Sequence, residues 1–201
     1  MTEQEWLSST DPREMLQFIE RNVSDRKLRL FACACCRRVW DEILDPISRE
    51  IVEVSERYAD GVVSDEKMTR VTNTTKIVDM AALHSASYPA RQCARDTAWY
   101  AARKDARKGA LNAADAMQAQ IFRDIVGNPF KQTASQAHWK TRSVLQLAQA
   151  IYDDRQFDLM PILGDALEEA GCESEDLLKH CRSGDVHVRG CWAVDLILGK
   201  E

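Results

Sequence analysis

SDRKLRLFACACCRRVWDEILDP, residues 24–46, is the segment most informative about the fold. Ser24 and Asp25 predict a helix N-terminus, and Asp45-Pro46 predicts its end, because the residue before a proline avoids the α region. Between these ends, apolar residues recur at steps of three and four, the spacing of one helix face. They are Leu28, Phe31, Ala32, Cys35, Val39 and Ile43. The segment therefore predicts one long helix with one buried face.

Helix signals recur on both sides of this segment. Thr2-x-x-Glu5 is a capping-box pattern, and Asp11-Pro12 places an N-cap residue before a proline at the first helical position. Pro46 opens a helix that Gly61 ends, and an alanine-rich stretch from 75 to 108 predicts two helices separated at Pro89. We therefore expect an all-α protein, an irregular bundle of roughly eight to ten helices.

The domain organisation follows from the turn signals. Gly127-Asn128-Pro129 predicts a helix end and a turn, and the polar residues that follow it lack helical periodicity. We expect a single helical domain, 1–201, with subregions 1–127 and 141–201 joined by an irregular segment, 128–140.

Composition and charge favour a cytoplasmic protein. The first residues are acidic, and no stretch approaches the roughly 20 apolar residues that cross a membrane. Seven cysteines, three of them crowded within residues 33–36, do not resemble a secreted disulfide framework, so reduced thiols are expected. The formal net charge of −5 disfavours a dedicated nucleic-acid binder.

The cysteine-rich helix allows two interpretations. Cys35 and Cys36 precede Arg37 and Arg38, and nearby cations lower a thiol pKa and make the thiolate more reactive. However, Cys35 lies on the apolar face defined above, where cysteine behaves as a small hydrophobic residue. We favour core packing.

A second group of cysteines and histidines occurs near the C-terminus. His180, Cys181, His187 and Cys191 supply the sulfur and imidazole ligands that zinc prefers, with glycines between them. The group lacks a paired C-x2-C motif, and adjacent helix residues such as His180 and Cys181 point in different directions. The alternative, which we favour, is that both cysteines pack in the core while His187 hydrogen-bonds locally.

A row of cations with one aromatic residue follows a single helix side at steps of four: Arg91, Arg95, Trp99, Arg103 and Arg107. Such a row could follow a nucleic-acid backbone, with Trp99 stacking on a base. A solvated face, or pairing with an acidic helix bearing Glu168 and Glu169, fits the negative net charge better.

Two strings, SDRKLRLFACACCRR at 24–38 and HVRGCWAVDLILGKE at 187–201, resemble those of a family of uncharacterised bacterial helical proteins. The resemblance extends to Glu53-x-x-Glu56-Arg-Tyr-Ala-Asp-Gly61, to Gly127-Asn-Pro-Phe130 and to the opening Thr2-Glu-x-Glu-Trp6. It implies a bacterial cytoplasmic protein and no particular reaction.

Three functional hypotheses follow. The first is a non-enzymatic interaction or regulatory module that recruits a protein partner, because charge is unevenly distributed: residues 153–176 hold nine carboxylates against one cation, Arg155. Self-association would fit the same pattern. The alternatives are a zinc protein using the His/Cys group and a nucleic-acid-associated factor using the basic row. Phosphate-binding glycine loops, nucleophile elbows and metalloprotease helices are missing from the sequence, so an enzyme is not the first expectation.

Overall fold

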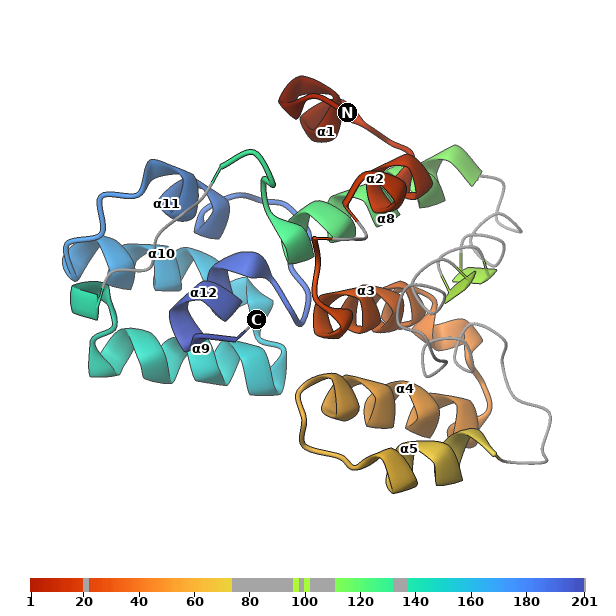
Figure 1. The fold of residues 1–201 in the computed structure, drawn as a ribbon. Helices are drawn as coiled ribbons and strands as arrows, with labels where there is room; N and C mark the ends of the chain where they lie inside the picture. Colours follow the sequence, from red (N-terminus) through yellow and green to blue (C-terminus); the bar gives the residue numbers. More distant parts are fainter. Residues whose placement is uncertain (20–21, 74–95, 98–99, 102–110, 132–136, 201) are drawn as a thin grey trace. The chain divides into compact units, whose positions relative to one another are not determined.

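A computed structural model describes the chain except for residues 20–21, 74–95, 98–99, 102–110, 132–136 and 201 (Figure 1). It separates into two compact units, Met1–Phe122 and Arg123–Glu201, each described here by itself. Within the described residues the structure holds ten α-helices with defined bounds, three short 3₁₀ helices and no strand. The prediction of an all-α, multi-helix protein is confirmed.

The N-terminal unit contains the helices whose ends the sequence marked. They are α1 (Glu3–Ser8), α2 (Pro12–Ile19), α3 (Asp25–Arg38), α4 (Pro46–Ala59), α5 (Asp65–Thr72) and the first part of α8 (Leu111–Val126). Thr2 forms the predicted capping box, in which its N–H donates to Glu5 Oε2 at 2.7 Å and its hydroxyl accepts from the Glu5 N–H. Ser24, Asp45 and Ser64 cap their helices through side-chain oxygens.

Helix α3 is shorter than the sequence predicted. It ends at Arg38, and the next residues form a 3₁₀ helix, Trp40–Glu42. The Arg49 side chain of α4 donates to two carbonyls of this turn, to Ile43 O at 2.8 Å and to Trp40 O at 3.2 Å. A donor from the next helix thus supplies hydrogen bonds here in place of those that a continued helix would have made.

Helices α3 and α4 pack side by side and bury charged groups between them (Figure 1). Arg37 holds the buried carboxylate of Glu56 through two hydrogen bonds, 3.1 Å from Nε and 2.8 Å from a terminal nitrogen. The guanidinium of Arg37 also stacks 3.9 Å from the Trp40 ring centroid. The three cysteines of α3 are buried, as the core-packing interpretation expects.

An aromatic group closes the other side of the N-terminal core. Trp6 of the short helix α1 is fully buried, with ring centroids 6.3 Å from Phe18 and 5.8 Å from Phe122. Phe31 meets Phe122 edge-on at 4.8 Å. These contacts tie α1, α2, α3 and α8 together.

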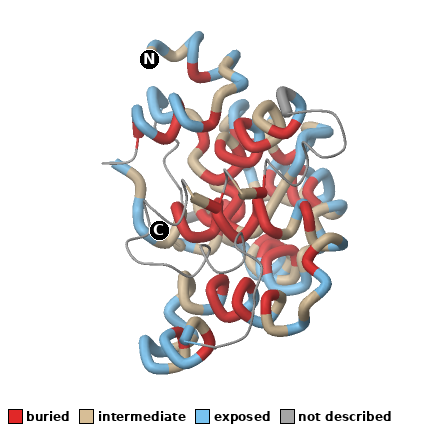
Figure 2. The backbone as a smooth tube through the Cα atoms, turned by 90° about the vertical axis from the view of Figure 1, so that its right-hand side faces the viewer, coloured by how far each residue is buried: buried red, intermediate tan, exposed pale blue. Residues whose placement is uncertain are grey.

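The C-terminal unit is built from α9 (Arg142–Asp154), α10 (Met160–Glu169), α11 (Glu175–Cys181) and α12 (Trp192–Leu198), together with the last turn of α8. Helices α10 and α12 both pack against α9, and α10 also packs against α11. Buried positions recur along each of these helices, and Figure 2 colours the buried segments of the chain red. They form one hydrophobic core, which includes Ile151, Leu163, Leu167, Leu177, Cys181 and Val194.

The division between the units lies inside α8, between Phe122 and Arg123. Gly127 does end α8 with a positive φ of 76°, so the predicted helix end is present. The break predicted at Pro89 lies outside the described residues. In the described part of the chain, every helix is too short or too polar to cross a membrane.

Candidate metal centre

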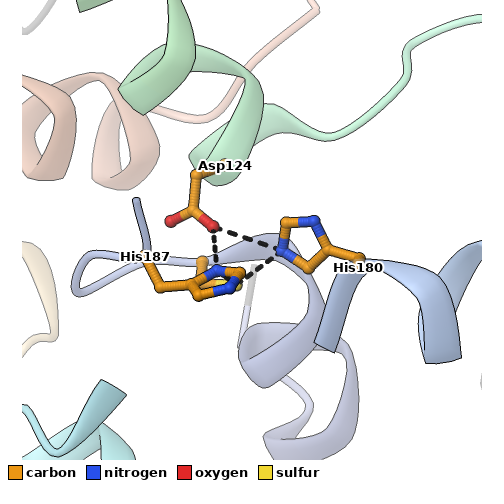
Figure 3. A group of neighbouring side chains, drawn as sticks. Asp124, His180 and His187 are labelled. Atoms are coloured by element: carbon orange, nitrogen blue, oxygen red, sulfur yellow. Dashed lines mark hydrogen bonds and ion pairs between the residues drawn. The ribbon is translucent and has the colours of Figure 1, made fainter. Parts of the chain in front are cut away.

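Four polar side chains from separate parts of the C-terminal unit converge on one point. Asp124 lies in the last turn of α8, His180 in the last turn of α11, His187 in the following loop, and Cys191 at the N-cap of α12. In Figure 3, the side chains of Asp124, His180 and His187 point toward one another. These four residues form a group that could hold a metal ion.

The loop between α11 and α12 is shaped to deliver two of these residues. Gly190 has a φ of 94°, a left-handed conformation that favours glycine, and the Cys191 N–H donates to Val188 O at 2.9 Å. The resulting turn places His187 and Cys191 on the same side of the loop, facing Asp124 and His180. The Val188 N–H donates to Asp124 Oδ2 at 2.9 Å, so the loop backbone holds the carboxylate in place.

The four side chains lie close together, and both histidines contact the same oxygen, Asp124 Oδ1. Asp124 Oδ1 lies 2.8 Å from His187 Nδ1 and 3.2 Å from His180 Nε2. Cys191 Sγ lies 3.2 Å from His180 Nε2 and 4.0 Å from His187 Nδ1. All four atoms lie within 4.8 Å of one another.

The group is shielded from solvent. The side chains of Asp124 and His187 are 3% and 5% exposed, Cys191 is fully buried, and only His180, at 16%, is partly open. Burial by itself raises the pKa of Asp124, but hydrogen bonds from His180 and His187 outweigh this effect and lower it. Burial, followed by the nearby Asp124 carboxylate, raises the pKa of the Cys191 thiol well above its usual value.

The pattern of contacts distinguishes two kinds of chemistry. In a nucleophilic thiol site, a histidine takes the thiol proton with one ring nitrogen and is oriented by an acid at the other nitrogen. Here His180 presents the same nitrogen, Nε2, to both Asp124 and Cys191, and His187 presents Nδ1 to both. A buried thiol with a raised pKa is also a poor nucleophile. The convergence on a common centre is compatible with a group that could hold a metal ion.

The sequence predicted three of the four residues in this group. Cys181, the predicted fourth residue, lies in the hydrophobic core because it follows His180 on one helix and points elsewhere. Asp124 takes its place. Cys181 and Cys191 both lie in the hydrophobic core, as the favoured alternative held, but His187 hydrogen-bonds to Asp124, 63 positions away, and not locally. Asp124 carried a signal: it lies three residues after Ile121, on the buried side of α8, where an unpaired carboxylate would be costly.

The remaining sequence hypotheses are not decided by the structure. The basic row Arg91, Arg95, Trp99, Arg103 and Arg107 lies outside the described residues. Glu168, one of its suggested partners, contacts Arg182 at 2.6 Å within the C-terminal unit, and Arg182 also binds Asp165. Nucleic-acid binding and recruitment of a protein partner therefore stay predictions.

Comparison of the chain with known protein families, with curated proteins and with solved structures gives no match.

Proposed function

We propose that this is a zinc-binding protein, in which Asp124, His180, His187 and Cys191 hold one ion. The convergence of two imidazole nitrogens, one thiol sulfur and one carboxylate oxygen carries the proposal. This mixed donor set suits zinc, whereas calcium and magnesium require oxygen ligands and copper(I) favours sulfur.

The spacing of the donor atoms supports a tetrahedral ion. For zinc bond lengths of about 2.0–2.3 Å, a regular tetrahedron separates its donors by roughly 3.3 Å, or roughly 3.5 Å when one is sulfur. Four of the separations in the group run from 2.8 to 4.0 Å. Small side-chain adjustments therefore suffice to accommodate an ion.

The ion we propose is structural. Protein atoms supply four donors, which completes the coordination of a structural zinc and leaves no position for a substrate. The ligands also come from three elements and a loop, so one ion links the last turn of α8 to α11 and α12. The Val188 N–H on Asp124 Oδ2 supplies the outer hydrogen bond that orients a ligating carboxylate.

The test is the metal content of protein purified without chelators. We expect about one zinc per chain by elemental analysis, and loss of it in Cys191→Ala and in Asp124→Asn. Cys181→Ala is the matched control, because Cys181 is an equally buried cysteine ten positions earlier that lies outside the group. It should retain the zinc.

Substoichiometric zinc in the wild-type protein, together with failure to take up zinc added to the chelator-treated protein, would overturn the proposal. Equal loss of zinc from the Cys181→Ala and Cys191→Ala proteins would overturn the ligand assignment. Circular dichroism of each variant would show whether its helices are retained, so that unfolding is not mistaken for loss of a ligand.

A further inference from the structure

Trp192 lies immediately outside the candidate metal centre and touches two of its ligand-bearing segments. Its ring centroid lies 4.9 Å from that of His180, with the planes inclined by 46°. On the α8 side, Gly127 packs so closely that a Cβ added there would lie 3.1 Å from Trp192 Cγ. Trp192 also follows Cys191 directly in the chain.

We infer that Trp192 is a positioning residue for the zinc site, which holds the His180 ring in its ligating orientation and slows release of the ion. This inference rests on the proposed zinc binding. Trp192 does not contact the ion; it acts through His180 and through the turn after Asp124.

His180 lies at the open side of the group. His180 is the most exposed of the four ligands at 16%, and its ring is the one against which Trp192 packs. A ligand at the open side of a site is the one that water and competing chelators reach first. An aromatic ring packed against this imidazole restricts its rotation and limits access to its nitrogen.

Gly127 packs closely against the indole of Trp192. Gly127 follows Asp124 by three residues, ends α8 with a φ of 76°, and its N–H donates to Arg123 O at 2.8 Å. Without a side chain, its backbone lies directly against the indole of Trp192. Trp192 is thus packed between the segment that bears Asp124 and the ring of His180.

The inference predicts a change in zinc release without a change of ligands. In Trp192→Ala, transfer of zinc to a chromogenic chelator should be about 10–100-fold faster than in the wild type, the range typical of lost outer contacts. Trp192→Phe keeps a ring beside His180 and should recover most of this difference. Cobalt in place of zinc should give altered visible absorption bands in Trp192→Ala only.

Leu196→Ala is the matched control, since Leu196 is a partly buried residue of the same helix, packed on the same core. If its release rate rises as much as that of Trp192→Ala, or if Trp192→Phe fails to recover the wild-type rate, the inference is wrong. Absence of zinc from the wild-type protein would instead refute the proposed function. If Trp192→Ala does not fold, the rates of Trp192→Phe and Gly127→Ala decide. A Cβ at residue 127 would require the indole to shift by a few tenths of an ångström, so Gly127→Ala should speed release.

Discussion

Glu56 is a buried carboxylate that forms a planar ion pair with Arg37. Arg37 reaches it with two parallel hydrogen bonds and stacks on Trp40 at the same time. Lysine keeps the charge but cannot form the planar pair or the stack. We therefore expect Arg37→Lys to lower the free energy of unfolding by about 1–2 kcal/mol in urea denaturation.

Arg13→Lys provides the comparison for this prediction. Arg13 also pairs with a carboxylate, that of Asp11 at 3.0 Å, but its side chain is 67% exposed. A solvent-exposed pair contributes little, so this change should cost less than about 0.5 kcal/mol. Equal effects of the two substitutions would show that burial of Glu56 does not set the strength of its pair.

The buried thiol of Cys181 should lower the free energy of unfolding at alkaline pH. Burial raises the pKa of its thiol to about 12, whereas an unfolded cysteine ionises near 8.5. Between these values the folded state keeps a proton that the unfolded state loses, so stability falls as pH rises. From pH 7 to 10 Cys181 should account for about 2 kcal/mol of the loss in urea titrations, so the loss should be smaller by about that amount in Cys181→Ala. Identical profiles for the two proteins would contradict this account.

For individual residues, the sequence predicted the histidine and cysteine members of the group but not the complete set of four. The histidines and Cys191 were predictable because they lie within one short segment. For Asp124, the sequence indicates only a buried carboxylate that needs a partner, and nothing local to α8 identifies His180, 56 positions later, as that partner. Such partners depend on tertiary packing, which spacing along the chain does not report.

Helix α1 illustrates how a single side chain can hold an element in place. Six residues are too few for a stable isolated helix, so α1 depends on its capping box and on the burial of Trp6. Trp6→Ala should lower the unfolding free energy by about 3–5 kcal/mol in chemical denaturation. Leu7→Ala, at an exposed position of the same helix, should change it by less than about 0.5 kcal/mol.

Helix starts were more predictable than helix ends. Ser24, Asp45 and Ser64 act as caps through hydrogen bonds to residues three positions later, so short-range sequence contains the whole interaction. The end of α3 depends on Arg49, which belongs to the next helix. Local periodicity therefore placed this end several residues too late.

For the whole molecule, the proposed ion should stabilise one unit and not the other. Bound zinc at 100 times its Kd would add about 2.7 kcal/mol to the unit that holds it. We expect chelation to accelerate amide hydrogen exchange in α11, α12 and the loop between them, with α3 and α4 unchanged. Faster exchange in all of these helices alike, or in none, would contradict a structural ion confined to the C-terminal unit.

The all-α class was predictable because many caps and apolar faces agree along the chain. The boundary between the two compact units was not predictable, because it lies inside α8 and no local sequence signal marks it. Turn signals mark where a helix ends, whereas a unit boundary depends on which helices share a core.

The wide separation of Asp124 from its partners also bears on the order of events during synthesis. The carboxylate leaves the ribosome well before His180, His187 and Cys191, and burying it without them would leave a charge without its partners. We expect the last turn of α8 to stay solvated until the loop carrying Val188 emerges, and metal loading to come after that. In stalled nascent chains, protection of α9–α12 from protease should then appear only once Cys191 has left the ribosome.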